Sequence, residues 1–226
     1  MSSIRPLADD VWVVDAPLSI LGLQLGTRCT LLRLADGGLW MHSPVPFDDE
    51  TRAAIAALGP VRAIVAPNTM HYLYLSAAAE AFPDAQVFVS AALAKKRPEL
   101  AHHTPLTEAP PPLWVGEIEQ RRFEGSPRLD ETVFFHRASG TVVLTDIIFN
   151  VTHSDSWWTR TYLRMANVWQ RVGPSRLLMS WVEDKAAASA SVLAMCDAWD
   201  FDRVCLCHGD VIAAGGRAKL REAWTL

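Results

Sequence analysis

The chain has 226 residues, of which 50% are hydrophobic and 20% charged, and its formal net charge is −4 at pH 7. The runs of basic residues at 95–97 and 121–122 are short enough to be ordinary solvated surface, which argues against a nucleic-acid partner. The N-terminus lacks the apolar core of a signal peptide, and no apolar run approaches the roughly 20 residues of a membrane helix. The four cysteines do not make a disulfide framework. We therefore expect one cytoplasmic domain over residues 1–226 with no membrane partner.

The first 45 residues predict β-strands. Residues 11–14 form a short β-branched run, and residues 29–34 and 39–42 flank the sequence Asp-Gly-Gly at 36–38. Asp and Gly tolerate the positive φ angles that a tight turn requires, so this segment predicts a β-hairpin.

Strands and helices alternate in the next part of the chain. The acidic residues 48–50 predict a helix start, and Gly59-Pro60 predicts its end. A strand at 62–66, a helix at about 72–81 and a strand at 86–89 follow. This order favours a sheet with helices packed against it.

The second half repeats this organisation after a proline-rich loop at 97–117. Its predicted elements are a second hairpin at 131–137 and 141–148, helices from 154 to about 199 with breaks at 173–174 and near 183, a strand at 203–207 and a last helix at 217–224.

Polar residues that could carry chemistry follow four of these predicted strands. They are His42, the pair Asn68 and His71, Asp146, and His208. Singly, each is better explained as a core-edge residue or a turn cap. Because ligand sites in layered α/β folds lie where strands end, four such positions in one chain favour a shared site.

The order of these segments resembles the metallo-β-lactamase superfamily over nearly the whole chain. The segments are LWMHSP, VRAIV, APNTMHYLYL, EGSPRLDETVFFH, GTVVLTDIIF and VCLCHGD. In that superfamily a strand leads into His-x-His-x-Asp-His, and later strands end in Gly-Asp and Gly-His-Gly. The resemblance implies a four-layer αββα sandwich, and it is closest to a divergent bacterial branch of unknown function that has lost the full histidine motif.

The histidine motif itself is largely replaced. With His71 aligned to its last histidine, Ala66 and Asn68 stand at the first two histidines and Met70 stands at the aspartate. Ser126 falls near the position of the third histidine of the metal site. Loss of the aspartate removes a general base, so no catalytic residue is assigned and a two-metal mechanism is not expected.

The resemblance leaves His71, Asp146 and His208 as candidate metal ligands. Three protein ligands and one open position are typical of hydrolytic zinc sites, where a bound water reaches a pKa of about 7. Asn68 is a weaker candidate because its carbonyl oxygen suits a hard cation, and His42 is a weaker candidate that the resemblance gives no ligand role. We expect one divalent ion at most (zinc, iron or manganese), with an empty site as the equal alternative.

Other reactive side chains are better explained structurally. Alternation along a strand places Cys205 and Cys207 on one face, which predicts buried core thiols, and Ser126 reads as a turn residue. Trp157 and Trp158 are adjacent on a predicted helix, so one of them is expected at a pocket or an interface.

Two functional hypotheses of different classes follow. The first is a metallo-hydrolase-like protein of unknown substrate with a degenerate metal site. The second is a catalytically inactive pseudoenzyme that binds a small molecule or a partner protein. A homodimer formed through the Trp-rich helical half is a third hypothesis.

Overall fold

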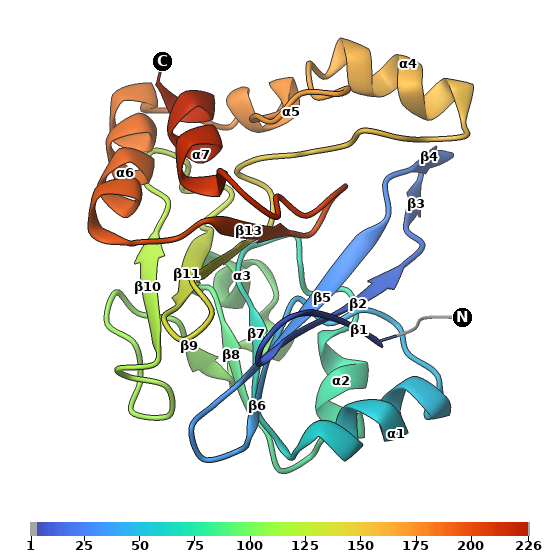
Figure 1. Cartoon of the computed structure of the whole chain (residues 1–226), viewed down its shortest axis with the longest axis vertical. Coiled ribbons are helices and arrows are strands. Elements are labelled where there is room, and N and C mark those ends of the chain that lie inside the picture. The colour runs from blue at the N-terminus through green and yellow to red at the C-terminus, as the bar shows by residue number, and fades with distance from the viewer. Residues whose placement is uncertain (1–3, 226) are drawn as a thin grey trace.

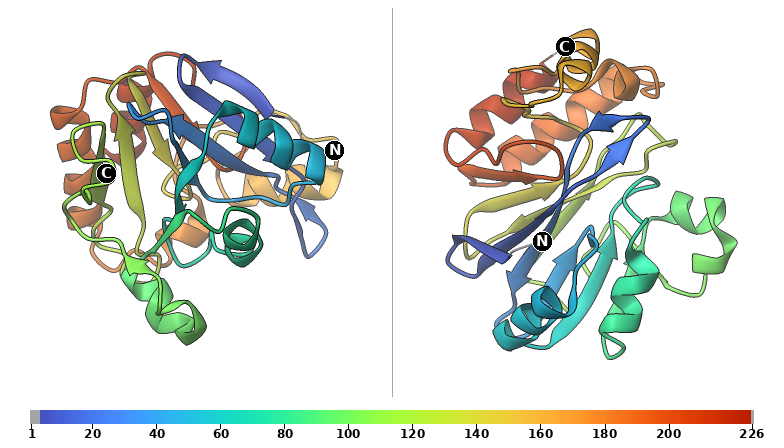
Figure 2. Two further views of the ribbon diagram at one scale, coloured as in Figure 1. Left: turned by 90° about the horizontal axis from the view of Figure 1, so that it is seen from below. Right: turned by 90° about the vertical axis from the view of Figure 1, so that its right-hand side faces the viewer.

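In the computed structural model, which describes residues 4–225, two β-sheets pack face to face and helices cover both outer faces (Figures 1 and 2). The right-hand view of Figure 2 shows the layers in sequence: helices from the C-terminal half, the smaller sheet, the larger sheet, and helices from the N-terminal half. The expected four-layer αββα sandwich is therefore confirmed.

The larger sheet has seven strands in the order β1-β2-β5-β6-β7-β8-β9. Pairing is antiparallel from β1 to β6 and parallel from β6 to β9. The predicted hairpin joins β5 to β6, and Gly37 at its tip has a φ of 82°. The strands are β1 (Ile4–Ala8), β2 (Val11–Ala16), β5 (Thr27–Arg33), β6 (Leu39–His42), β7 (Val61–Ala66), β8 (Gln86–Val89) and β9 (Thr104–Pro105).

The smaller sheet has four strands in the order β10-β11-β12-β13. Its first three strands are antiparallel, and β12 pairs in parallel with β13. A separate two-stranded hairpin, β3–β4, projects toward α4 in Figure 1. These strands are β10 (Ile118–Arg122), β11 (Thr132–His136), β12 (Thr141–Leu144), β13 (Arg203–Leu206), β3 (Ser19–Ile20) and β4 (Leu23–Gln24).

Helices from the two halves of the chain cover opposite sheets. Buried residues of α1, α2 and α3 pack on the larger sheet, and those of α6 and α7 pack on the smaller one. Five of the seven α-helices of the described chain begin at an Asp or Ser whose side chain accepts a backbone N–H, as N-caps do. The helices are α1 (Asp49–Leu58), α2 (Leu75–Ala81), α3 (Ala91–Lys96), the 3₁₀ helix η1 (Pro98–Leu100), α4 (Trp157–Met165), α5 (Arg176–Met179), α6 (Lys185–Ala198) and α7 (Gly216–Trp224).

Strand β6 shows how alternation builds the layers. Leu39 and Met41 pack under the helices of the larger sheet, whereas Trp40 packs between the two sheets. Successive side chains of a strand point to opposite faces, so a fully apolar strand must be covered on both. All four residues of β6 are buried, including His42 at its end.

The structure adds elements that the sequence pattern did not predict. These are β1, the hairpin β3–β4, helix α3, and the short η1 and β9 inside the predicted loop 97–117. Helix α2 begins at Leu75 rather than at 72, because residues 71–74 form a turn. Within the described residues, no helix has the length and apolar character that crossing a membrane requires.

Candidate metal centre

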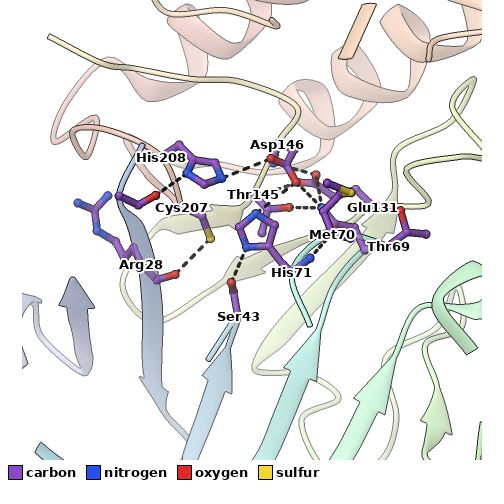
Figure 3. A network of polar contacts seen from close by, with 12 residues as sticks. Arg28, Ser43, Thr69, Met70, His71, Glu131, Thr145, Asp146, Cys207 and His208 are labelled. Carbon is purple, nitrogen blue, oxygen red and sulfur yellow. Dashed lines mark hydrogen bonds and ion pairs between the residues drawn. The ribbon is translucent and has the colours of Figure 1, made fainter. Parts of the chain in front are cut away.

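Strand register brings Asp146 and His208 to the same edge of the smaller sheet. Leu144 at the end of β12 pairs with Leu206 at the end of β13, and the two strands run in parallel. Asp146 and His208 each lie two residues beyond this pair. Their side chains consequently emerge side by side, as Figure 3 shows.

His71 arrives from the larger sheet through the turn that follows β7. The side-chain oxygen of Asn68 accepts the backbone N–H groups of Met70 and His71, both at 2.8 Å. Such a bond from Asn to the backbone two or three residues ahead is a common way of closing a turn. This turn directs the His71 ring toward Asp146 (Figure 3).

These three candidate ligands form a compact cluster. His71 Nε2 lies 3.3 Å from Asp146 Oδ2, and His208 Nε2 lies 3.6 Å from Asp146 Oδ1. One ligand atom from each residue lies within 4.8 Å of the other two. Their side chains are only 8%, 15% and 8% exposed for His71, Asp146 and His208.

Both imidazole rings make a polar contact through Nδ1, the ring nitrogen on the side away from Asp146. The Nδ1–H group of His208 donates to the Gly26 carbonyl oxygen at 2.8 Å, and the ring stacks on Phe149. The Nδ1 atom of His71 lies 2.7 Å from Ser43 Oγ. Hydrogen bonds of this kind fix the ring orientation and tautomer of metal-binding histidines.

Burial and charge act differently on the three groups. Burial lowers the pKa of His208 to about 4 despite the opposing effect of Asp146, so this ring is neutral at pH 7. Burial also lowers the pKa of His71, but the Asp146 carboxylate and Cys207 outweigh it and raise that pKa well above its ordinary value. Burial opposes ionisation of Asp146, yet the two imidazoles hold its pKa at about 2.

The donor set fits one divalent ion. Because the Gly26 carbonyl can only accept, the proton of neutral His208 sits on Nδ1, and the lone pair of Nε2 faces a carboxylate oxygen. Two acceptors facing each other repel unless a cation lies between them. Two imidazole nitrogens and one carboxylate are ligands that zinc, iron and manganese accept.

A second group of polar residues lies behind Asp146. Asn68 Nδ2 approaches Asp146 Oδ2 and Thr145 Oγ1, each at 2.8 Å, and Glu131 Oε2 at 3.2 Å. Glu131 also accepts the backbone N–H groups of Thr145 at 2.7 Å and Asp146 at 2.9 Å. Burial, with the Asp146 charge, raises the pKa of Glu131 to about 7, against the effect of those N–H groups. We call Asn68, Glu131 and Thr145 the buried network.

The two weaker candidate ligands have other surroundings. Asn68 turns its oxygen to backbone N–H groups and its amide nitrogen to Asp146, so it offers no free oxygen to a cation. His42 stacks on Trp40 and packs against Phe134 between the sheets. It is fully buried, both its ring nitrogens lack a hydrogen-bond partner among the described residues, and burial lowers its pKa to about 3. Neither residue joins the cluster.

The other residues considered from sequence lie outside it as well. Ser126 Oγ donates to the Trp181 carbonyl, as a turn serine would. Cys205 and Cys207 both point toward β5, where they contact Thr30 and the Arg28 carbonyl, which confirms that the thiols share one face. The sequence did not predict that Cys207 would neighbour His71.

Sequence reasoning also missed Glu131 and Ser43. Glu131 lies immediately before the buried strand β11, where an acidic residue in an apolar context was the only signal. Ser43 follows His42 directly and has a φ of 52°, an uncommon conformation that directs its hydroxyl to His71.

Comparison with known proteins agrees with this architecture. The family model "Domain of unknown function (DUF4336)" matches residues 8–159. No curated protein gives a significant match. The chain is similar to a solved metallo-β-lactamase structure from Erythrobacter litoralis, with 15% identity, a TM-score of 0.67 and coverage of 99% of this chain and 96% of that one.

Two further solved structures give the same result. The metallo-β-lactamase FIM-1 from Pseudomonas aeruginosa, in a mono-zinc form, shares 13% identity with a TM-score of 0.64, covering 99% of this chain and 94% of that one. The enzyme from Pontibacter korlensis shares 11% identity with a TM-score of 0.67, covering 99% of both chains. At these identities the similarity establishes the fold, as the resemblance in the sequence implied.

Proposed function

This chain belongs to the DUF4336 family and has the metallo-β-lactamase fold, and from this premise we propose that it is a metallo-hydrolase-like protein whose degenerate site binds at most one divalent ion. The observation that carries the proposal is the convergence of His71, Asp146 and His208 from distant parts of the chain, with their ligand atoms within 4.8 Å of one another.

The residues of the cluster would hold the ion, and their neighbours would orient them. His71 and His208 contribute Nε2 atoms, while Ser43 and the Gly26 carbonyl bind the opposite ring nitrogens. A divalent ion bound there would supply Lewis-acid activation of a substrate or of water at neutral pH.

The limit of one ion follows from the buried network. The amide group of Asn68 lies 2.8 Å from Asp146 Oδ2, where it occupies the approach to that oxygen from the protein interior. Glu131 accepts from three N–H groups and is fully buried, so it positions Asp146 and Asn68.

One observation favours the alternative, a pseudoenzyme that binds a small molecule or a partner without catalysis. The raised pKa of His71 means that its imidazolium can donate from Nε2 to Asp146 and satisfy that carboxylate without a metal. Metal binding would have to displace this proton, because a ligating histidine must be neutral.

Metal analysis of the purified protein decides between the two. We expect one equivalent of zinc, iron or manganese in the wild type after refolding with excess metal, and none in His208→Ala. His153→Ala is the matched control, since His153 is 81% exposed and lies outside the cluster. Metal-dependent hydrolysis of p-nitrophenyl acetate, lost in His208→Ala, would support catalysis. A wild-type protein that stays metal-free under these conditions would replace the hydrolase proposal with the pseudoenzyme.

A further inference from the structure

A cavity of about 390 Å³ opens directly onto the cluster. His71, Asp146 and His208 all line it. The opposite walls come from the hairpin β3–β4 and from helices α4 and α5, and the backbone N–H of Gln24 donates to Thr159 Oγ1 where hairpin and helix meet. At about 30 Å³ per water-sized group, the volume holds on the order of a dozen such groups, which is within the range of small-molecule sites.

The walls of this cavity are apolar. Leu18, Leu23 and Leu25 line it from the hairpin, and Leu163 and Val168 line it from α4 and the segment after it. Beyond the cluster, the polar side chains of the lining carry hydroxyl groups. They are Thr27, Ser43, Tyr74, Tyr162 and Ser175.

No described lining residue is a lysine or an arginine, and the carboxylate and imidazoles of the lining are those of the cluster. Arg28 appears beside the cluster in Figure 3, but its guanidinium binds Asp15 at 2.7 Å and the Leu206 carbonyl at 2.8 Å. A charged group of a ligand, placed on the inner walls of the cavity away from the cluster, would therefore be desolvated without an oppositely charged partner.

The rim of the cavity continues this character. Of the nine large hydrophobic side chains that the described residues leave exposed, five line this one cavity. Leu21, Leu73 and Leu177 are 92%, 67% and 50% exposed. Clustered exposed apolar side chains at a concave site are typical of ligand-binding surfaces.

We propose that the ligand of this site is an uncharged molecule with an apolar chain or ring that fills the cavity between β3–β4 and α4, its polar end at the cluster. Only if the proposed function holds is this ligand a substrate. The apolar walls would bind the same class of molecule in a pseudoenzyme.

Two fluorescent probes of nearly equal shape test the charge requirement. N-phenyl-1-naphthylamine is uncharged at pH 7.5, and 1-anilinonaphthalene-8-sulfonate carries a sulfonate on a similar ring system. We expect the metal-free protein to bind the uncharged probe at least about tenfold more tightly, because the lining holds no lysine or arginine and the His71 imidazole already faces the Asp146 carboxylate at 3.3 Å. Equal or tighter binding of the sulfonate would overturn the proposal.

A matched pair of substitutions locates the binding. Leu177→Lys places a cation on the cavity wall and should weaken the uncharged probe about tenfold while strengthening the sulfonate. Val115→Lys changes a side chain that is 58% exposed but lines a different surface depression, and it should leave both affinities unchanged. Equal effects of the two substitutions would place the probe elsewhere and refute the proposal. Leu73→Lys repeats the test at a more exposed wall position should Leu177→Lys fail to fold.

The metal content tests the proposed function, and the probe preference tests this inference separately. A protein that binds metal but prefers the sulfonate, even when stripped with EDTA, would keep the proposed function and lose this inference. A metal-free protein that prefers the uncharged probe would lose the hydrolase proposal and keep the apolar ligand.

Discussion

Asp146 lies between two regions that satisfy polar groups in different ways. On its interior side, Asn68, Glu131 and Thr145 form contacts of 2.7 to 3.2 Å. On its cavity side, the two imidazole nitrogens stand 3.3 and 3.6 Å away, longer than a good N–H···O bond.

The two sides of Asp146 therefore have different roles, one in stabilising the fold and one in binding a ligand. A buried hydrogen-bonded network rigidifies the positions that it connects, and its polar groups face one another rather than the cavity. The cavity side presents Nε2 atoms on two oriented rings that line the cavity, which is what a binding site requires. The interior side therefore holds Asp146 in place, and the proposed chemistry concerns the side that faces the cavity.

The largest expected effect comes from removing the centre of the buried network. Glu131→Leu leaves the buried backbone N–H groups of Thr145 and Asp146 without their acceptor, whereas the Asn68 amide keeps Asp146 and Thr145. Each unsatisfied buried donor costs about 1–3 kcal/mol, so for these two donors we expect the free energy of unfolding to fall by roughly 2–6 kcal/mol. Urea denaturation at pH 7.5 in EDTA measures it.

Glu124→Leu provides the control, because Glu124 is exposed on the segment that precedes β11 and should change stability by no more than about 0.5 kcal/mol. Similar losses for both variants would mean that the network carries no special stability, and the contrast between the two sides of Asp146 would disappear.

The sequence predicted the cavity side of this contrast better than the interior side. His71, Asp146 and His208 each follow an apolar strand, and parallel strands bring their carboxyl ends to one edge. Glu131 has no comparable signal, because its role depends on backbone N–H groups that any sequence at 145 and 146 would present. The sequence suggests an oxygen ligand at Asn68, but the amide turns its nitrogen to Asp146, and a sequence does not show which end of an amide faces a site.

The cavity itself lay beyond sequence reasoning. Its hairpin wall comes from residues 18–25, where a run of leucines with Leu21 and Gly22 at positive φ has no strong strand alternation. The cytoplasmic location, the single domain, the absence of a nucleic-acid partner and the homodimer remain predictions. Trp157 and Trp158 are 69% and 45% exposed, which leaves them available for such a contact.

A smaller effect on stability should come from His42, which lies between the sheets and outside the cluster. His42 has a pKa of about 3 in the folded chain against 6.5 ordinarily, because burial disfavours its charged form. A depressed pKa gives stability that is present above pH 6.5 and is lost as the pH falls toward 3, at about 1.4 kcal/mol per pH unit. Relative to His42→Phe, the wild type should therefore lose roughly 2 kcal/mol between pH 6.5 and pH 5.

Urea denaturation of both proteins across this range checks the slope, and His153→Phe, at an exposed position, should follow the wild type. A wild-type profile parallel to that of His42→Phe would show that His42 gains a partner on protonation. The cluster and its surroundings would then be less sharply divided than the structure indicates.

The smallest effect concerns the orientation of one ring on the cavity side. Ser43→Ala removes the hydroxyl that lies 2.7 Å from His71 Nδ1 and keeps the β-carbon at this positive-φ position. Loss of such a supporting bond typically lowers metal affinity by about 10- to 100-fold, and we expect the lower end because Asp146 also restrains the ring. Competition with a chromophoric zinc chelator at pH 7.5 measures the affinity.

Ser139→Ala is a close control. Ser139 Oγ makes the equivalent 2.8 Å contact with His136 away from the cluster, so this substitution should leave zinc binding unchanged. If Ser43→Ala binds zinc as the wild type does, His71 is not a ligand, and the cavity side would retain only Asp146 and His208.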